Sequence, residues 1–84
     1  MRTRTKEIGT KNIVGQRIKS KREELGLSQK NFLAQLQIGG LDLSSSAVSK
    51  IEGQFRHIND VELIVVAQTL KVSVDWLLGL DDDD

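Results

Sequence analysis

Apolar residues recur at three- and four-residue spacing along most of the chain, which is the periodicity of amphipathic helices. A first helix is expected over residues 12–25, ended by Gly26 in a left-handed conformation. A second helix is expected over 29–37, with Ser28 as its N-cap. The side chains expected to face the core from these two helices are Ile13, Val14, Ile18, Lys21 (its stem only), Leu25, Phe32, Leu33 and Leu36.

Three further helices are predicted, over 44–54, from 60 to about 70, and over 74–78, each behind a polar residue that can cap it. The expected caps are Ser44, Asn59 (with Glu62 as its capping-box partner) and Ser73. The side chains expected to face the core are Val48, Ile51, Val61, Ile64, Val65, Leu70, Trp76 and Leu77.

This pattern predicts an all-α fold. No segment alternates apolar and polar residues with a period of two, so no strand is expected. At 84 residues the chain has room for one core. We expect a compact five-helix domain over residues 12–80, a flexible basic arm over 1–11 and an acidic tail over 81–84.

Composition excludes several classes of protein. With no cysteine and one histidine, His57, the chain has no ordinary zinc ligand set, so no metal site or cofactor is expected. It also lacks a glycine-rich phosphate loop, and we expect no enzymatic activity. No apolar run of about 20 residues and no signal-peptide pattern occurs, which predicts a cytoplasmic protein without membrane contact. No small-molecule ligand is indicated.

The net charge is zero, but the charges are distributed unevenly. Residues 1–30 contain nine basic and three acidic side chains, whereas residues 81–84 are four aspartates. Because salt screens charges beyond about 8–10 Å, a local excess matters more to a partner than the total. The basic first third of the chain is therefore compatible with a nucleic-acid partner.

The helix expected over 44–54 has an unusual outer face, made of small hydroxyls and one long cation. These residues are Ser45, Ser46, Ser49 and Lys50. A helix of this kind can enter the major groove of DNA, which is about 12 Å wide. From this helix alone, a serine-rich surface helix without a binding role is an equally good interpretation, and the neighbouring segments are needed to decide.

Four motifs in order connect the chain with a known family. They are Arg17-Ile18-Lys19 through Arg22, Gly26-Leu27-Ser28-Gln29, Ser46-Ala47-Val48-Ser49-Lys50-Ile51-Glu52, and Val72-Ser73-Val74-Asp75-Trp76-Leu77-Leu78-Gly79. With them, residues 13–80 resemble the lambda-repressor-like (Cro/CI-type, XRE) helix-turn-helix family of bacterial and phage regulators. The resemblance implies a sequence-specific regulator of transcription, a repressor, that binds double-stranded DNA with helix 44–54 in the major groove.

The resemblance also implies roles for single residues. The base-contacting positions fall on Ser45, Ser46, Ser49 and Lys50. The phosphate-contacting positions fall on Lys19, Lys21, Arg22, Gln29, Ser44, Gly53, Gln54 and Arg56. Arg22 and Glu52 match a structural ion pair of the family that leaves part of the guanidinium available to a phosphate. A single such domain binds weakly, so we expect a homodimer on half-sites about 34 Å apart, with the last helix (Trp76, Leu77, Leu78, Leu80) as the dimer surface.

The sequence departs from the family pattern in two places. The turn over 37–43 is about five residues longer than usual, and Gly39-Gly40 either touches DNA or only lengthens the loop. The glycine that normally closes the recognition helix stands one position early, at Gly53, with Gln54 in its place. The alternative function is an antitoxin or adaptor that uses the same fold for protein–protein interaction, which the near-neutral charge favours.

Overall fold

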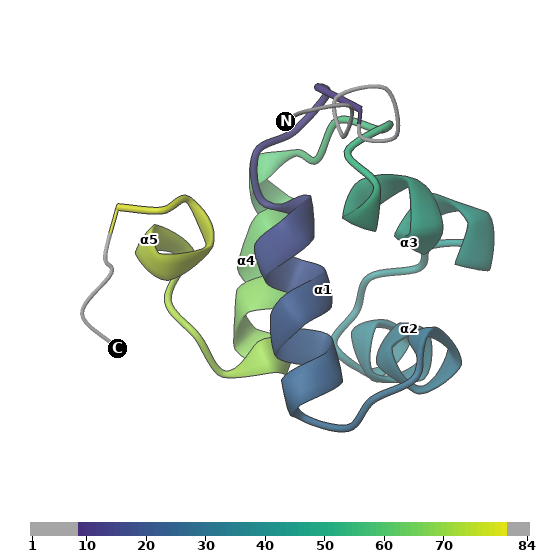
Figure 1. Cartoon of the computed structure of the whole chain (residues 1–84). Helices are drawn as coiled ribbons and strands as arrows, with labels where there is room; N and C mark the ends of the chain where they lie inside the picture. The colour runs from purple at the N-terminus through teal and green to yellow at the C-terminus, as the bar shows by residue number, and fades with distance from the viewer. Residues whose placement is uncertain (1–8, 81–84) are drawn as a thin grey trace.

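The computed structural model describes residues 9–80, which form short helices joined by turns. Five helices and no strand lie in that range, which confirms the predicted all-α fold (Figure 1). The helices are α1 (Gly15–Glu24), α2 (Gln29–Ile38), α3 (Ser45–Glu52), α4 (Asp60–Leu70) and α5 (Val74–Leu77).

Each of the last four helices begins at a cap that the sequence predicts. The side-chain oxygen of the capping residue accepts a hydrogen bond from the amide three residues later, which satisfies one otherwise unpaired donor of the first turn. These cap and amide pairs are Ser28 with Asn31, Ser44 with Ala47, Asn59 with Glu62, and Ser73 with Trp76. The Asn59–Glu62 pair is a complete capping box, as predicted.

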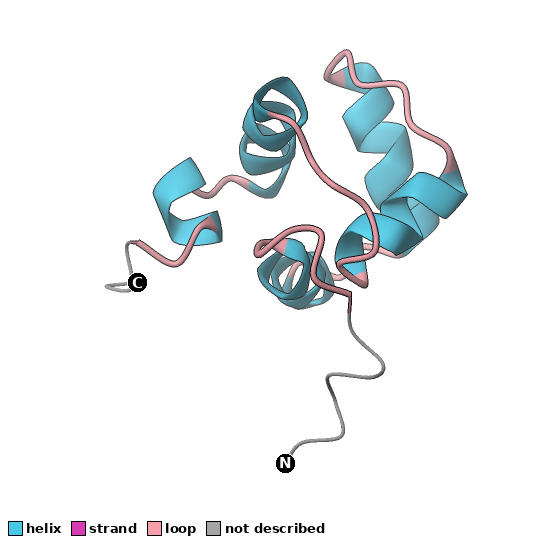
Figure 2. Cartoon of the chain, turned by 90° about the horizontal axis from the view of Figure 1, so that it is seen from above, coloured by secondary structure: helices cyan, strands magenta, loops and turns pink. Residues whose placement is uncertain are grey.

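The helices surround α1 and α4, which lie side by side (Figures 1 and 2). The helices α2 and α3 lie on one side of this pair, whereas α5 lies on the other side, against α4. The two helices of the helix-turn-helix, α2 and α3, therefore contact each other and also contact the central pair.

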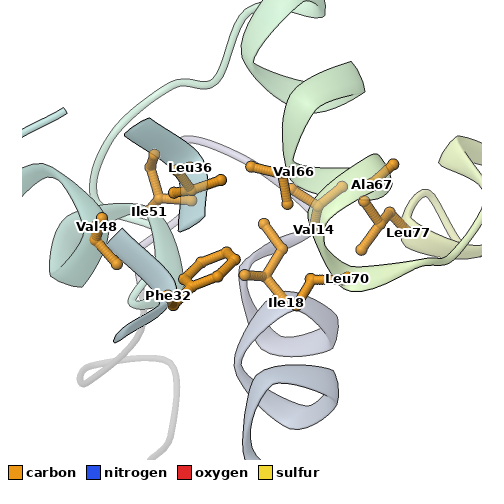
Figure 3. Close-up of a cluster of buried hydrophobic side chains, with 10 residues drawn as sticks. All are labelled: Val14, Ile18, Phe32, Leu36, Val48, Ile51, Val66, Ala67, Leu70 and Leu77. Atoms are coloured by element: carbon orange, nitrogen blue, oxygen red, sulfur yellow. The ribbon is translucent and has the colours of Figure 1, made fainter. Parts of the chain in front are cut away.

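All five helices contribute to one hydrophobic core (Figure 3). Its buried side chains are Val14 just before α1, Ile18, Phe32, Leu36, Val48, Ile51, Val66, Ala67, Leu70 and Leu77. Burying a large side chain of this kind contributes about 1.5–3 kcal/mol. Val48 and Ile51, the narrow apolar edge expected for the third helix, join α3 to this core.

Some residues expected to be inside are exposed. Ile13 is 70% exposed because α1 begins only at Gly15 and Ile13 precedes it. In α4, Val61 and Ile64 are exposed, and Val66 and Ala67 are buried instead. Residues 63–67 of this helix form a continuous apolar run, so the sequence pattern does not select one face there, and packing against α1 and α5 does.

Residues 9–11, which were expected in the flexible arm, are bonded to the folded domain. The amide of Gly9 donates to the Gly53 carbonyl at 2.8 Å, and the amide of Lys11 donates to the Gln54 carbonyl at 2.9 Å. Residues 9–11 therefore belong to the folded domain and lie against the end of α3. The rest of the expected arm, 1–8, and the acidic tail, 81–84, are outside the described residues.

The long turn after α2 closes that helix and then returns to the core. Gly40 has a φ of +98°, a left-handed conformation that suits glycine, and the amide of Leu41 donates back to the Leu36 carbonyl. Gly39 lies beside Val65 of α4, and Leu41 and Leu43 pack against the core. These contacts support the interpretation of Gly39-Gly40 as a longer loop.

Candidate nucleic-acid interface

The outer face of α3 presents the four residues that the sequence predicts for base contacts. Ser45, Ser46, Ser49 and Lys50 are all exposed, because they occupy the positions opposite the buried edge of Val48 and Ile51. Their spacing places the pairs 45/49 and 46/50 one helical turn apart on neighbouring rows. The structure thus gathers these residues on one polar surface with a single cation.

The inner face of α3 is tied to α1 by the Arg22–Glu52 pair. Arg22 Nε lies 2.7 Å from Glu52 Oε2, and Arg22 Nη2 lies 3.1 Å from Glu52 Oε1. The remaining nitrogen, Nη1, donates to the Leu27 carbonyl at 2.7 Å. Each guanidinium nitrogen of Arg22 donates one hydrogen bond within the protein and the residue is only 7% exposed, so Arg22 acts first as a positioning residue and is a weaker phosphate candidate than the sequence predicts.

Gln29, the first residue of α2, extends this pair to the surface of α3. Its Nε2 donates to Glu52 Oε1 at 3.0 Å, and its Oε1 accepts the Ser49 hydroxyl at 3.0 Å. The side chain is half-buried, so it joins the helices and still borders the exposed face of α3. Sequence reasoning identified Gln29 but missed its bonds to Glu52 and Ser49, because spacing along the chain does not show them.

Asn12 is a further structural residue that the sequence analysis missed. Its Oδ1 accepts the amides of Val14 and Gly15 at the start of α1, and its Nδ2 donates to the carbonyls of Ile51 at 3.1 Å and Arg56 at 2.8 Å. One buried amide therefore fixes the entrance of α1 against the end of α3. An asparagine just before an apolar-periodic segment is the only sequence signal for this role.

The α1–α3 contact is close enough to require glycine at one position. A Cβ added at Gly15 would lie 2.3 Å from the Ile51 carbonyl oxygen and 2.8 Å from that of Glu52. These are backbone atoms at the end of α3, so the helices would have to separate. The orientation of α3 is therefore set by Arg22, Asn12 and the missing side chain of Gly15 together.

The end of α3 does not offer the backbone amides that were expected to contact phosphate. The amides of Gly53 and Gln54 donate to the carbonyls of Ser49 and Ile51 within the protein. Gln54 has a φ of +67°, so it occupies the left-handed position where glycine is usual, and its Nε2 donates to the Asn12 carbonyl. Gly53 and Gln54 are thus helix-closing residues, because their donors are already bonded.

Arg56 is also committed to another role. Its Nη1 and Nη2 each lie 3.0 Å from an oxygen of Glu62, and Nη1 also donates to the His57 carbonyl. The hydrogen bonds raise the pKa of Arg56 above its ordinary value, and they lower the pKa of Glu62 although burial opposes this. Because its charge is neutralised by Glu62, Arg56 is a weaker phosphate candidate than the sequence predicts.

The two candidate lysines of α1 lie on different faces. Lys21 Nζ lies 5.2 Å from the centre of the Trp76 ring and 3.2 Å from Glu24, so it faces α5, on the side of the fold away from α3. Lys19 is exposed and lies one helical turn from both Gly15 and Arg22, which face α3. Lys19 therefore stays a candidate phosphate contact beside α3, and Lys21 does not.

Ser44 and Lys50 border an open hollow between one side of α3 and the loop that follows it. Its lining residues are Ser44, Ser46, Ala47, Lys50, Phe55 and Arg56. Lys50 makes no ion pair with a described residue, whereas Arg56 does, so the positive charge of this hollow comes from Lys50. An anion would find there an ammonium group and the hydroxyl of Ser44.

Helix α5 exposes less apolar surface than the dimer interface expected from its sequence would need. Leu77 is fully buried in the core, and the Trp76 ring is covered by Lys21 and by Arg17, whose Cζ lies 4.9 Å from its centre. Leu80 is exposed. Leu77 is therefore not part of a dimer surface, and the expectation for Trp76 is weakened.

The arrangement defines a fold. The five helices of residues 9–80, with α2 and α3 as the helix-turn-helix and a polar outer face on α3, have the fold of a lambda-repressor-like helix-turn-helix domain. Among solved structures, it is similar to a crystal structure of the P22 c2 repressor protein in complex with synthetic operator 9T in the presence of Tl+. That match has a TM-score of 0.65 and 27% sequence identity, and it covers 83% of this chain and 98% of the other. No protein-family model matches the chain, and no curated protein matches it either.

Within residues 9–80, no group of three or more histidine, cysteine, aspartate or glutamate side chains could hold a metal ion. None of the helices found there has the length and apolar character needed to cross a membrane.

Proposed function

We propose that this chain is a sequence-specific DNA-binding regulator of transcription, a repressor, that places α3 in the major groove. The observation that supports this most directly is the contrast between the two sides of α3. Its inner side is fixed by Arg22, Gln29 and Asn12, whereas its outer side presents small hydroxyls and Lys50 to solvent. A rigid helix with a small polar face meets the steric demand of the groove. The similarity to a repressor in complex with an operator supports the same function.

The proposed contacts divide into two kinds. Base contacts are made by Ser45, Ser46, Ser49 and Lys50. Phosphate contacts are made by the side chains of Lys19 and Ser44 and by the backbone amide of Gln29 in the first turn of α2. These groups border the exposed face and fix the register of the helix on the duplex. Because serine makes weaker base contacts than arginine or glutamine, the shape of the DNA shares in the discrimination.

The regulator is proposed to act as a homodimer. One helix-turn-helix offers few phosphate contacts, and affinity for DNA grows with the number of phosphates that are neutralised. Two copies related by a two-fold axis would read half-sites about one helical turn apart. The DNA site of such a dimer is a pseudo-palindrome, and the affinity for it falls steeply as the salt concentration rises.

Selection from random duplexes at two salt concentrations tests this function directly. The expected result is one palindromic motif, recovered at both concentrations. Equal, weak retention of every sequence would contradict a sequence-specific regulator and would favour the protein-interaction alternative. Placing the recovered site across the promoter of a reporter then tests repression, which is expected to lower its expression.

Charge reversal at Lys50 is the sharpest single substitution. Lys50→Glu should reduce affinity for the selected site by about tenfold to a hundredfold, because a base or phosphate contact is lost and a repulsive charge is added. Its matched control is Lys71→Glu at the C-terminal end of α4, which should change affinity little. If both variants bind equally well, α3 is not the recognition helix.

A further inference from the structure

The exposed hydroxyl of Ser49 has a fixed hydrogen-bonding direction. It is the last member of a chain of side chains that starts in the interior, at Arg22, and runs through Glu52 and Gln29 to the surface of α3. Among the serines of α3, Ser49 is bonded to another side chain, whereas Ser45 and Ser46 make no side-chain hydrogen bond with a described residue. Ser49 therefore differs in kind from its neighbours.

The chemistry of each member determines the direction of the next bond. Arg22 can only donate, and a carboxylate beside it can only accept, so Glu52 requires a donor from Gln29. The only donor of the Gln29 side chain is its NH₂ group, which must therefore face Glu52. The carbonyl Oε1 of Gln29 then faces Ser49, and the Ser49 hydroxyl must donate to it. This order follows from donors and acceptors and does not depend on seeing hydrogen atoms.

We infer that Ser49 recognises an amino group on a base edge and rejects a keto oxygen. With its hydrogen committed to Gln29, the hydroxyl has only lone pairs left for the groove. In the major groove, adenine N6 and cytosine N4 are donors, whereas guanine O6 and N7 and thymine O4 are acceptors. The base facing Ser49 is therefore adenine or cytosine on the contacted strand. This inference rests on the proposed function, since it assigns specificity to the same helix.

The size of the preference follows from one hydrogen bond. A single bond of this kind contributes a factor of about three to ten in affinity, and an acceptor placed against the lone pairs is disfavoured further. A freely rotating serine would supply either a donor or an acceptor and would show no such preference. The discrimination is thus made by the orientation of Gln29 inside the protein.

The chain of hydrogen bonds from Arg22 through Glu52 and Gln29 to Ser49, here called the relay, can be tested without DNA. In the free protein, the side-chain amide protons of Gln29 should exchange with solvent more slowly than those of Gln37, which is exposed and makes no side-chain hydrogen bond with a described residue. Amide exchange followed by nuclear magnetic resonance measures the difference. Equal exchange rates would overturn the relay while leaving the proposed function intact.

The base preference is tested by repeating the random-site selection with variants of the full chain. Ser49→Ala should remove the preference at one base position, which identifies the position that Ser49 contacts. The wild type should select adenine or cytosine there by about three- to tenfold, and Gln29→Met should accept all four bases, because the hydroxyl is then free to donate. Ser46→Ala removes another proposed base contact, so it should change the selection at a different base position and leave the position of Ser49 unchanged.

The outcomes separate the two ideas. If the wild type selects guanine or thymine at that position, or if Gln29→Met keeps the preference for adenine and cytosine, the inference is overturned and the regulator remains. If no base position responds to Ser49→Ala, it is overturned as well. If the wild type selects no motif at all, the proposed function itself fails. Thermal unfolding of each variant verifies that it is folded before selection.

Discussion

Two arginine–glutamate pairs with two-pronged geometry flank α3, and they differ in burial and in what they join. Arg22–Glu52 has side chains 9% and 3% exposed and connects α1 with the last residue of α3 across 30 positions of sequence. Arg56–Glu62 has side chains 32% and 10% exposed and connects a loop with the start of α4 across six positions. The first pair orients a helix, whereas the second pair secures a local turn.

The difference shows where in this fold a buried polar contact is needed. A buried pair is costly to desolvate and is retained where one orientation is needed, whereas a partly exposed pair is screened by water. The buried pair lies directly behind the face of α3 that is proposed to meet DNA, and Gln29 connects the two. The Arg56–Glu62 pair borders that face at Arg56 but makes no side-chain hydrogen bond with it.

The largest expected effect comes from breaking the buried pair. Arg22→Met should lower the free energy of unfolding by about 3–5 kcal/mol, because Glu52 remains as a buried charge with only Gln29 as donor. Arg56→Met should cost only about 1 kcal/mol. Urea unfolding followed by the fluorescence of Trp76, the single tryptophan, measures both.

A double variant sharpens this result. Replacing both Arg22 and Glu52 with methionine should restore most of the lost stability, since no unpaired charge is left. If Arg22→Met and Arg56→Met lower the free energy of unfolding equally, burial does not distinguish the two pairs and the comparison fails.

A second, smaller effect comes from Asn12, which lies between the two pairs. Its Nδ2 donates to the carbonyl of Ile51, next to Glu52, and to that of Arg56. Asn12→Ala should destabilise by about 2–4 kcal/mol, because buried amides and carbonyls lose their partners. Asn12→Asp should keep the bonds at the start of α1, because Oδ1 only accepts there. It should still lose the two bonds that Nδ2 donates to the carbonyls of Ile51 and Arg56.

Amide hydrogen exchange would locate these losses along the chain. Asn12→Asp should increase exchange at the end of α3 more than at the start of α1, whereas Asn12→Ala should increase it at both. A uniform increase in both variants would argue against Asn12 as the connection between the two regions.

The sequence predicts the features of this fold that are decided locally. Caps at Ser28, Ser44 and Ser73 depend on one side chain and an amide three residues away, so a short stretch of sequence contains all the information. The polar face of α3 is predictable for the same reason. In α4 the prediction of the buried side was wrong at Val61 and Ile64, because the continuous apolar run over 63–67 leaves no clear periodicity that selects a face.

The features that sequence analysis missed depend on distant partners. Glu62 was predicted as a capping-box residue and Arg56 as a phosphate contact, but nothing in the sequence indicates that they bind each other. The expected Arg22–Glu52 contact came from family resemblance, and the bonds of Gln29 to Glu52 and Ser49 came only from the structure. Polar partners at long range are fixed by packing, which a linear pattern does not record.

The smallest predicted effect is a pH dependence that belongs to the partly exposed Arg56–Glu62 pair. The hydrogen bonds from Arg56 lower the pKa of Glu62 below its ordinary value of 4.5, so the folded state binds this proton less readily than the unfolded state. The stabilisation is therefore fully present above about pH 4.5 and is lost as the pH falls through the lower folded pKa. Arg56 adds no dependence in this range, because its pKa is raised and it stays charged.

Glu62→Gln isolates this contribution, because glutamine can still complete the capping box with Asn59 while it lacks the charge. The variant should lose about 1 kcal/mol at neutral pH, and its difference from the wild type should shrink as the pH falls below 4.5. Glu24→Gln, at a carboxylate 65% exposed, is the matched control and should show little change. Urea unfolding at several pH values measures the difference. If the difference in the free energy of unfolding between wild type and Glu62→Gln stays constant down to low pH, the charge of Glu62 does not stabilise the turn. The Arg56–Glu62 pair would then differ from Arg22–Glu52 in its contribution to stability as well as in burial.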